Sequence, residues 1–264
     1  MKRIVYSIYN GCVEQTAIST NKHKLSQFIK YKDNLRKSQR AYAEKCNAEY
    51  VLHETDITNY DSIQFEKIFL LEKYAEEYDE ILYLDFDIVP HIFKDIFQSV
   101  DLTKISMHPL KRELTKKEIA WEIRNKNNKD HLHLFDQHSV FCKTAAKNSM
   151  LLLDGISGHN KLYNTGVIIG DSQSIKKLEF SRHLEEMKIM LNEAQTDCIF
   201  PEEISKYFFH NNEVFISYLL ERYNVPHNDL EIQWNFILDP LYPNVNEAAY
   251  FIHHVNKEFE LSFD

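Results

Sequence analysis

The chain has 264 residues, of which 44% are hydrophobic and 13% aromatic, so it can form a full apolar core and is not a disordered protein. Its formal net charge of −9 argues against the broad positive field that attracts proteins to nucleic acid, and no nucleic-acid partner is expected. The 5 glycines are too scattered to form a glycine-rich phosphate-binding loop, so a phosphorylated ligand would need a local cation, most simply a metal ion.

The cysteines and the N-terminal segment favour a cytoplasmic protein. The 4 cysteines contain no C-x-x-C pair and are expected to be reduced thiols rather than a disulfide or zinc framework. The apolar run after Met1-Lys2-Arg3 is too short and too polar for a signal peptide, so an N-terminal strand is expected there. No window approaches the ~18 apolar residues of a membrane span.

Strand and helix patterns alternate in the first third of the chain. Strands are expected at Arg3–Tyr9, Glu49–His53 and Ile81–Leu84, and the last of these is apolar throughout, as in a strand covered on both faces. Amphipathic helices are expected at Lys24–Cys46 and Ser62–Tyr78. This alternation predicts βαβ units and a mostly parallel central sheet with right-handed crossovers.

The rest of the chain continues this pattern less regularly, and we predict one α/β domain over residues 1–264. The expected strands are Lys104–His108, Asn164–Gly170 and Ala249–Ile252, the expected helices are Ser174–Leu191 and Asn211–Tyr223, and Lys111–Lys129 is expected to be a surface helix or loop.

The strongest candidate site is Asp85-Phe86-Asp87, which directly follows the apolar strand. Strand alternation would point both carboxylates to one side and Phe86 to the other. Neighbouring carboxylates repel each other unless a cation lies between them, and their hard oxygens suit Mg²⁺ or Mn²⁺. We therefore predict a metal site here; the alternative is an ordinary strand-end turn with two solvated acids.

Histidines occur at two further places of interest. His253-His254 ends the last expected strand, and one of the two is a candidate third ligand for the same ion. A second group combines histidines with an acid but matches no standard zinc spacing, so a polar loop or strand is the preferred interpretation; its members are His131, His133, Asp136 and His138.

Two polar segments could contact a sugar. Asn164-Thr165-Gly166 opens an apolar strand, where the glycine permits close approach of a ligand and the asparagine can donate to and accept from hydroxyls. Asn211-Asn212-Glu213 is expected to cap the N-terminus of the helix that follows. Glu213 in its first turn is either a general base or an acid placed at the positive end of a helix.

In this order the motifs resemble the GT-A fold glycosyltransferases that use nucleotide sugars, most nearly glycosyltransferase family 8, which includes glycogenin and bacterial galactosyltransferases. The segments that carry the resemblance are Phe65-Glu66-Lys67-Ile68, Tyr83-Leu84-Asp85-Phe86-Asp87-Ile88, Asn164-Thr165-Gly166-Val167, Asn212-Glu213, Trp234-Asn235, and Phe251-Ile252-His253 followed by Lys257. The chain differs from the family in having Asn212-Glu213 where Asp-Gln is usual, and in a shortened terminal motif without its glycine and proline.

The resemblance implies a GT-A fold and a transferase of the hexosyltransferase type. Such a transferase would take its sugar from a nucleotide diphosphate sugar, UDP-linked by resemblance alone. It would transfer this sugar to a hydroxyl acceptor on a glycan or glycoconjugate. Asp85 and Asp87 would hold Mn²⁺ or Mg²⁺ against the donor diphosphate, and His253 would complete the protein ligands. The remaining donor contacts implied are Lys67, Lys257, Phe86, and, for the nucleoside, Ser7 and Tyr9.

Asn164 would lie beside the transferred sugar, with Glu213 in the segment where the family places its residue facing the anomeric carbon. The family retains the anomeric configuration, whereas a base at Glu213 would suit inversion, and both outcomes are open at this stage.

Two other functions remain open from the sequence. A haloacid-dehalogenase-like phosphatase also has a D-x-D after an apolar strand, and Gly170-Asp171-Ser172 is similar to its later acidic motif. Against this, Val89 stands where that family has Thr or Ser. A sugar-nucleotide or glycan-binding domain without catalytic activity is the third possibility.

Overall fold

The computed structural model describes residues 1–10, 22–55, 60–111, 132–185, 202–208, 211–238 and 248–263. The chain divides into two compact units, each described separately here. The first unit comprises Met1–His108, Thr165–Glu179 and Pro226–Asp264, and the second comprises Pro109–Asn164 and Phe180–Val225.

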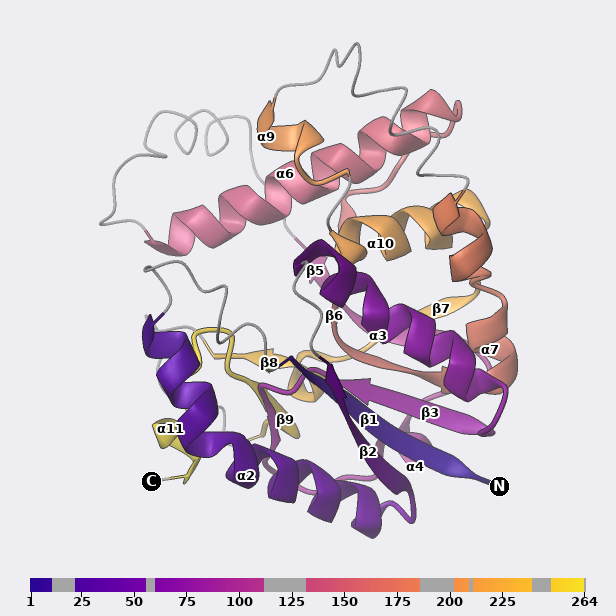
Figure 1. Cartoon of the computed structure of the whole chain (residues 1–264). Coiled ribbons are helices and arrows are strands. Elements are labelled where there is room, and N and C mark those ends of the chain that lie inside the picture. Colours follow the sequence, from indigo (N-terminus) through magenta and orange to yellow (C-terminus); the bar gives the residue numbers. More distant parts are fainter. Residues whose placement is uncertain are drawn as a thin grey trace. The chain divides into compact units, whose positions relative to one another are not determined.

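A mixed sheet of six strands, most of whose residues belong to the first unit, has the order β2-β1-β3-β6-β5-β7 (Figure 1). The strands are β1 (Arg3–Asn10), β2 (Glu49–Thr55), β3 (Glu80–Leu84), β5 (Ile105–Lys111), β6 (Lys161–Asp171) and β7 (His227–Asp229). β1 is parallel to both β2 and β3, and β5 is parallel to β7, whereas β3 and β6 are antiparallel. The predicted α/β class with a mostly parallel central sheet is thereby confirmed.

The apolar sequence of β3 explains its central place in this sheet. All 5 of its residues are buried, and Leu82 and Leu84 belong to a core cluster that also includes Val5 and Val167 on the neighbouring strands. Two helices pack on the strands: α2 (Lys22–Lys45) contacts β2, and α3 (Tyr60–Ala75) contacts β1 and β3. Both helices lie close to their predicted positions.

A second, smaller sheet has the order β4-β9-β8. Its strands are β4 (Ile88–Pro90), β8 (Phe236–Ile237) and β9 (Phe251–His253), with the 3-10 helix η2 (Ile232–Trp234) just before β8. Short helices α4 (Ile96–Ser99), α7 (Ser172–Lys176) and α11 (Glu260–Phe263) complete the first unit. The last strand, β9, begins two residues later than the predicted start at Ala249. It ends at His253, which pairs with Ile88 of β4.

The second unit is built on helices α6 (Leu132–Leu153), α9 (Glu202–Ser205) and α10 (Asn212–Arg222). α6 packs against both α9 and α10. Lys147 of α6 is fully buried, where it pairs with Glu221 of α10 and donates to the carbonyl oxygens of His159 at 2.6 Å and Lys161 at 2.8 Å. These donor bonds compensate for the burial of the ammonium group.

The helix predicted at Ser174–Leu191 is interrupted. α7 ends at Lys176, and helical structure resumes only at residues 180–185, the last described part of this segment. Glu179, which lies between the two helical stretches, adopts a left-handed conformation (φ 42°) that a right-handed helix cannot include. The region Lys111–Lys129, apart from Lys111 at the end of β5, lies outside the described residues.

Two further findings concern the described residues alone. Their helices include none that is long and apolar enough to cross a membrane. Cys46 and Cys142 are buried free thiols, as expected, and the other two cysteines lie outside the described ranges.

Candidate metal-binding site

Asp85 and Asp87 lie on a tight turn between β3 and β4. Ile88 N donates to the Asp85 carbonyl oxygen at 3.0 Å and closes the turn, while Asp85 N donates to Gly166 O of β6 at 2.8 Å. His254 N donates to the Asp87 carbonyl oxygen at 3.0 Å and ties the turn to the C-terminal segment. The predicted strand alternation is therefore wrong for these residues: β3 ends at Leu84, and the turn brings the two carboxylates together.

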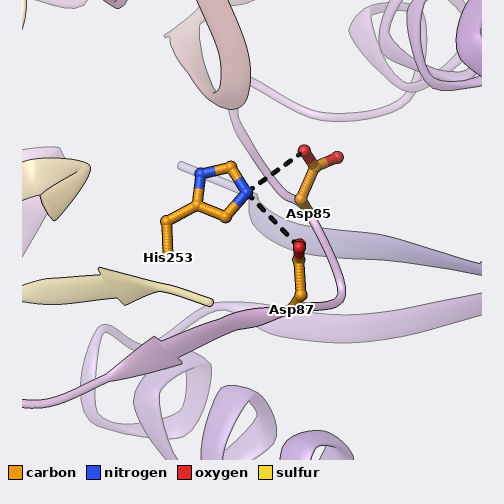
Figure 2. Close-up of side chains that lie close together, drawn as sticks. All are labelled: Asp85, Asp87 and His253. Atoms are coloured by element: carbon orange, nitrogen blue, oxygen red, sulfur yellow. Dashed lines mark ion pairs between the residues drawn. The ribbon is translucent and has the colours of Figure 1, made fainter. Parts of the chain in front are cut away.

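His253 joins the two carboxylates. Its Nε2 lies 3.9 Å from Asp85 Oδ2 and 3.5 Å from Asp87 Oδ2 (Figure 2). The antiparallel pairing of Ile88 with His253 across β4 and β9 brings the imidazole to the turn. Each side chain offers one ligand atom, and these atoms lie within 4.8 Å of one another, a grouping able to hold a metal ion in the described part of the chain.

The other side of the His253 ring is held by Asn235. His253 Nδ1 lies 2.9 Å from Asn235 Oδ1, and the Asn235 side chain is fully buried. An amide oxygen only accepts, so this bond assigns the ring proton to Nδ1 and turns the lone pair of Nε2 toward the carboxylates. Two carboxylates and one neutral imidazole fit Mn²⁺ and also accommodate Mg²⁺.

His254 has a different environment from its neighbour. Its Nε2 lies 2.8 Å from Ser262 Oγ, and the ring is almost fully buried. Burial lowers the pKa of His254 to about 4, although Asp87 acts in the opposite direction, so the ring is neutral near pH 7. The structure therefore identifies His253, rather than His254, as the histidine that faces the carboxylates.

Both carboxylates have cationic partners. Lys67 Nζ lies 3.1 Å from Asp85 Oδ1 and donates to the Thr165 carbonyl oxygen at the same distance. The buried Tyr83 hydroxyl donates to the same Asp85 oxygen at 2.5 Å. These two donors hold Oδ1 of Asp85, while its Oδ2 is the oxygen nearer to His253.

Asp87 pairs with Lys257 through its Oδ2. Burial of Asp87 opposes its ionisation, but the positive charge of Lys257, together with the adjacent His253 ring, outweighs this effect and holds the pKa of Asp87 well below its usual range. Asp87 is therefore ionised, which is the form of a carboxylate that binds a cation, and its Oδ2 lies near His253.

The predicted sugar-contacting residues form a separate group within the second unit. Asn164 Nδ2 donates to Glu213 Oε1 at 2.8 Å, and Lys143 Nζ donates to Glu213 Oε2 at 2.6 Å. Within the predicted capping stretch Asn211-Asn212-Glu213, the structure identifies Asn211 as the cap of α10, since its Oδ1 accepts from Val214 N at 3.1 Å. The sequence-based prediction did not include the hydrogen bond between Asn164 and Glu213 or the pairing of Lys143 with Glu213. The predicted contacts of Asn164 and Glu213 with a donor sugar stay predictions.

The predicted nucleoside contacts lie at the end of β1. Ser7 is fully buried and its hydroxyl donates to Gln39 Oε1 at 2.7 Å. Tyr9 packs edge-on against Phe86, with 5.3 Å between ring centroids. The donor-binding roles of these three residues stay predictions.

The histidine group of the middle region contributes no described site. His133, Asp136 and His138 fall on α6, but their side chains, and the whole of His131, lie outside the described residues.

The sequence-based prediction missed two side chains that contact the site. These are Gln39, which donates to main-chain oxygens of the turn, and Asn235, which bonds to the His253 ring. Asn235 stood in one of the family-like segments, which was a usable signal. Gln39 is an isolated amide within a polar stretch of helix and carries no recognisable pattern.

No protein-family model matches the sequence, and no curated protein matches it. Solved structures similar to this chain include a glycosyltransferase involved in the glycosylation of the major capsid of PBCV-1, at 12% identity and a TM-score of 0.49 over 100% of both chains. Another is mouse xyloside xylosyltransferase 1 in its apo form, at 13% identity and a TM-score of 0.43 over 97% of this chain and 98% of that one. Similarities this distant carry no argument about activity.

Proposed function

We propose that this protein is a metal-dependent glycosyltransferase. It moves a hexose from a nucleotide diphosphate sugar, UDP-linked by resemblance, to a hydroxyl group of a glycan or glycoconjugate. The observation that carries the proposal is the convergence of Asp85, Asp87 and His253, three residues from two separate family-like segments, on one set of ligand distances. The lysines of two such segments, Lys67 and Lys257, also pair with these carboxylates.

The charges of the site residues suggest a role for each of them in binding the metal ion and the donor. Mn²⁺ or Mg²⁺, when bound, supplies the positive charge that a leaving diphosphate needs. Asp85 and Asp87 would hold the ion, and His253 would supply a neutral ligand oriented by Asn235. Lys67 and Lys257 keep two further positive charges beside the carboxylates, in a chain whose net charge is −9. Asn164 and Glu213 are proposed to contact the transferred sugar.

Metal-dependent binding of the nucleotide tests this proposal. UDP should raise the melting temperature when Mn²⁺ is present and should have little effect in EDTA. Asp87→Asn should abolish the Mn²⁺-dependent rise, because an amide is a much weaker ligand than the ionised carboxylate. Asp101→Asn is the matched control, since the Asp101 carboxylate lies in the same unit but accepts from Thr103 and pairs with Lys104. Equal stabilisation by UDP in EDTA would contradict the metal assignment.

The reaction itself distinguishes this proposal from the phosphatase alternative. With a nucleotide sugar and no acceptor, the protein should slowly release nucleotide diphosphate in the presence of Mn²⁺, and a panel of nucleotide sugars would identify the donor. A phosphatase would instead release inorganic phosphate from an aryl phosphate. A covalent phosphoaspartate at Asp85, detected by mass spectrometry, would contradict the transferase.

A further inference from the structure

The side-chain amide of Gln39 is fully buried where α2 passes the turn that carries Asp85 and Asp87. Its Nε2 donates to two carbonyl oxygens of the turn, Asp85 O at 3.0 Å and Ile88 O at 2.9 Å. Its Oε1 accepts from Ser7 Oγ of β1 at 2.7 Å and from Tyr50 Oη of β2 at 3.0 Å. Both N–H donors and both acceptor positions of the buried amide therefore have hydrogen-bond partners.

The orientation of this amide follows from its partners. Both turn partners are carbonyl oxygens, which only accept, so the NH₂ group must face them. On the other side, hydroxyl groups can donate to the amide oxygen. Burial raises the pKa of Tyr50 to about 12, so its hydroxyl keeps its proton at all ordinary pH values and remains a donor.

The two bonds from Gln39 fall at the two ends of the turn that carries Asp85 and Asp87. The Asp85 carbonyl oxygen accepts both from Ile88 N, which closes the turn, and from Gln39. The Ile88 carbonyl oxygen is the first of β4, the strand whose pairing with β9 places His253. Loss of the amide donors would thus loosen the turn at both ends and leave two buried carbonyl oxygens with fewer partners.

We infer that Gln39 is a positioning residue for the metal-binding turn, through which β1 and β2 hold Asp85 and Asp87 at ligand distance from His253. This inference rests on the proposed function, because it assumes that the turn binds a metal ion. Gln39 bonds to main-chain oxygens of the turn and not to the carboxylates of Asp85 and Asp87. Its effect is on the affinity for the ion.

Mn²⁺ titration of the full chain, followed by calorimetry or by the electron paramagnetic resonance signal of free Mn²⁺, tests the inference. Gln39→Met and Gln39→Leu each remove the donors to the turn and the acceptor side without adding charge. Each should weaken Mn²⁺ binding about 10–100-fold, the range for residues that support metal ligands.

Tyr42→Phe is the matched control. Tyr42 lies one turn further along α2 and is also buried, but its hydroxyl bonds to Lys94 O and Ile96 N instead of the turn. It should lose stability while keeping the Mn²⁺ affinity. If the Gln39 variants fail to fold, Tyr50→Phe removes a single bond to the amide and should weaken Mn²⁺ binding about two- to tenfold.

The outcomes are distinguishable. Wild-type affinity in the Gln39 variants, or an equal loss in Tyr42→Phe, would overturn the positioning role and leave the proposed function standing. A wild-type chain that binds no Mn²⁺ would overturn both. Selective weakening in the Gln39 variants supports the inference.

Discussion

Substitution of Glu213 by Gln tests whether this carboxylate takes a proton or only positions its neighbours. One oxygen of Glu213 accepts from Asn164 at 2.8 Å and the other from Lys143 at 2.6 Å, and the side chain is 11% exposed. Both oxygens of Glu213 thus already accept hydrogen bonds from neighbouring side chains. We therefore expect Glu213 to orient the Asn164 amide rather than to act as a general base.

The two roles predict different magnitudes. A general base contributes ~10²–10⁴-fold to the rate, and Glu213→Gln would remove that contribution. A glutamine can still accept from Asn164 but cannot pair with Lys143, so the loss of a charged, partly buried hydrogen bond should cost about 1.5–3 kcal/mol of stability. At roughly 2–4 °C per kcal/mol, the melting temperature should fall by roughly 3–12 °C. We expect turnover to fall less than about tenfold, below the range for a lost base.

The assay measures nucleotide diphosphate released from the donor in the presence of Mn²⁺, together with the anomeric configuration of the product by proton NMR. Glu221→Gln is the control, because Glu221 lies on the same helix and also pairs with a lysine, the fully buried Lys147. This control should lose at least as much stability and keep its turnover. A hundredfold or greater fall in turnover for Glu213→Gln, at unchanged donor affinity, would refute the positioning role and restore the base.

Two further predictions concern the first unit. Asn235→Leu removes the acceptor that fixes the His253 ring, so Mn²⁺ should bind about 10–100-fold more weakly, and equal affinity in a titration would contradict the assigned ring orientation. Burial raises the pKa of Cys46 from 9.0 to about 12. The unfolded chain therefore loses this proton first, and the contribution to stability declines as pH rises from 9 toward 12. At pH 8 iodoacetamide should modify Cys46 only after unfolding, and rapid modification of the native chain, read by peptide mass spectrometry, would contradict this.

Local patterns in the sequence determined the elements that surround the site. The hydrophobic run Ile81–Leu84 is buried as a central strand, because a continuously hydrophobic segment is stable only when both faces are covered. The predicted capping stretch Asn211-Asn212-Glu213 does contain the cap of its helix, Asn211, since capping needs only residues a few positions apart. The residue types of the candidate metal ligands were also readable, because hard cations require oxygen donors whatever the fold.

The geometry of the site was decided by tertiary structure. Strand alternation placed Asp85 and Asp87 on one side for the wrong reason, since a turn closed by Ile88 brings them together. The choice of His253 over His254 depends on the pairing of β4 with β9, two strands separated by about 160 positions in the chain. Such pairing cannot be read from local periodicity, because neither strand has more than 3 residues.

The same reason explains why Gln39 and the partners of Glu213 escaped sequence reasoning. A glutamine within a helix has the same local pattern whether it faces solvent or fastens a distant turn. Only the packing of α2 against β4 gives its amide the carbonyl oxygens of Asp85 and Ile88. The sequence thus specified which chemical groups are present and which segments are buried, while long-range hydrogen bonds determined which groups meet.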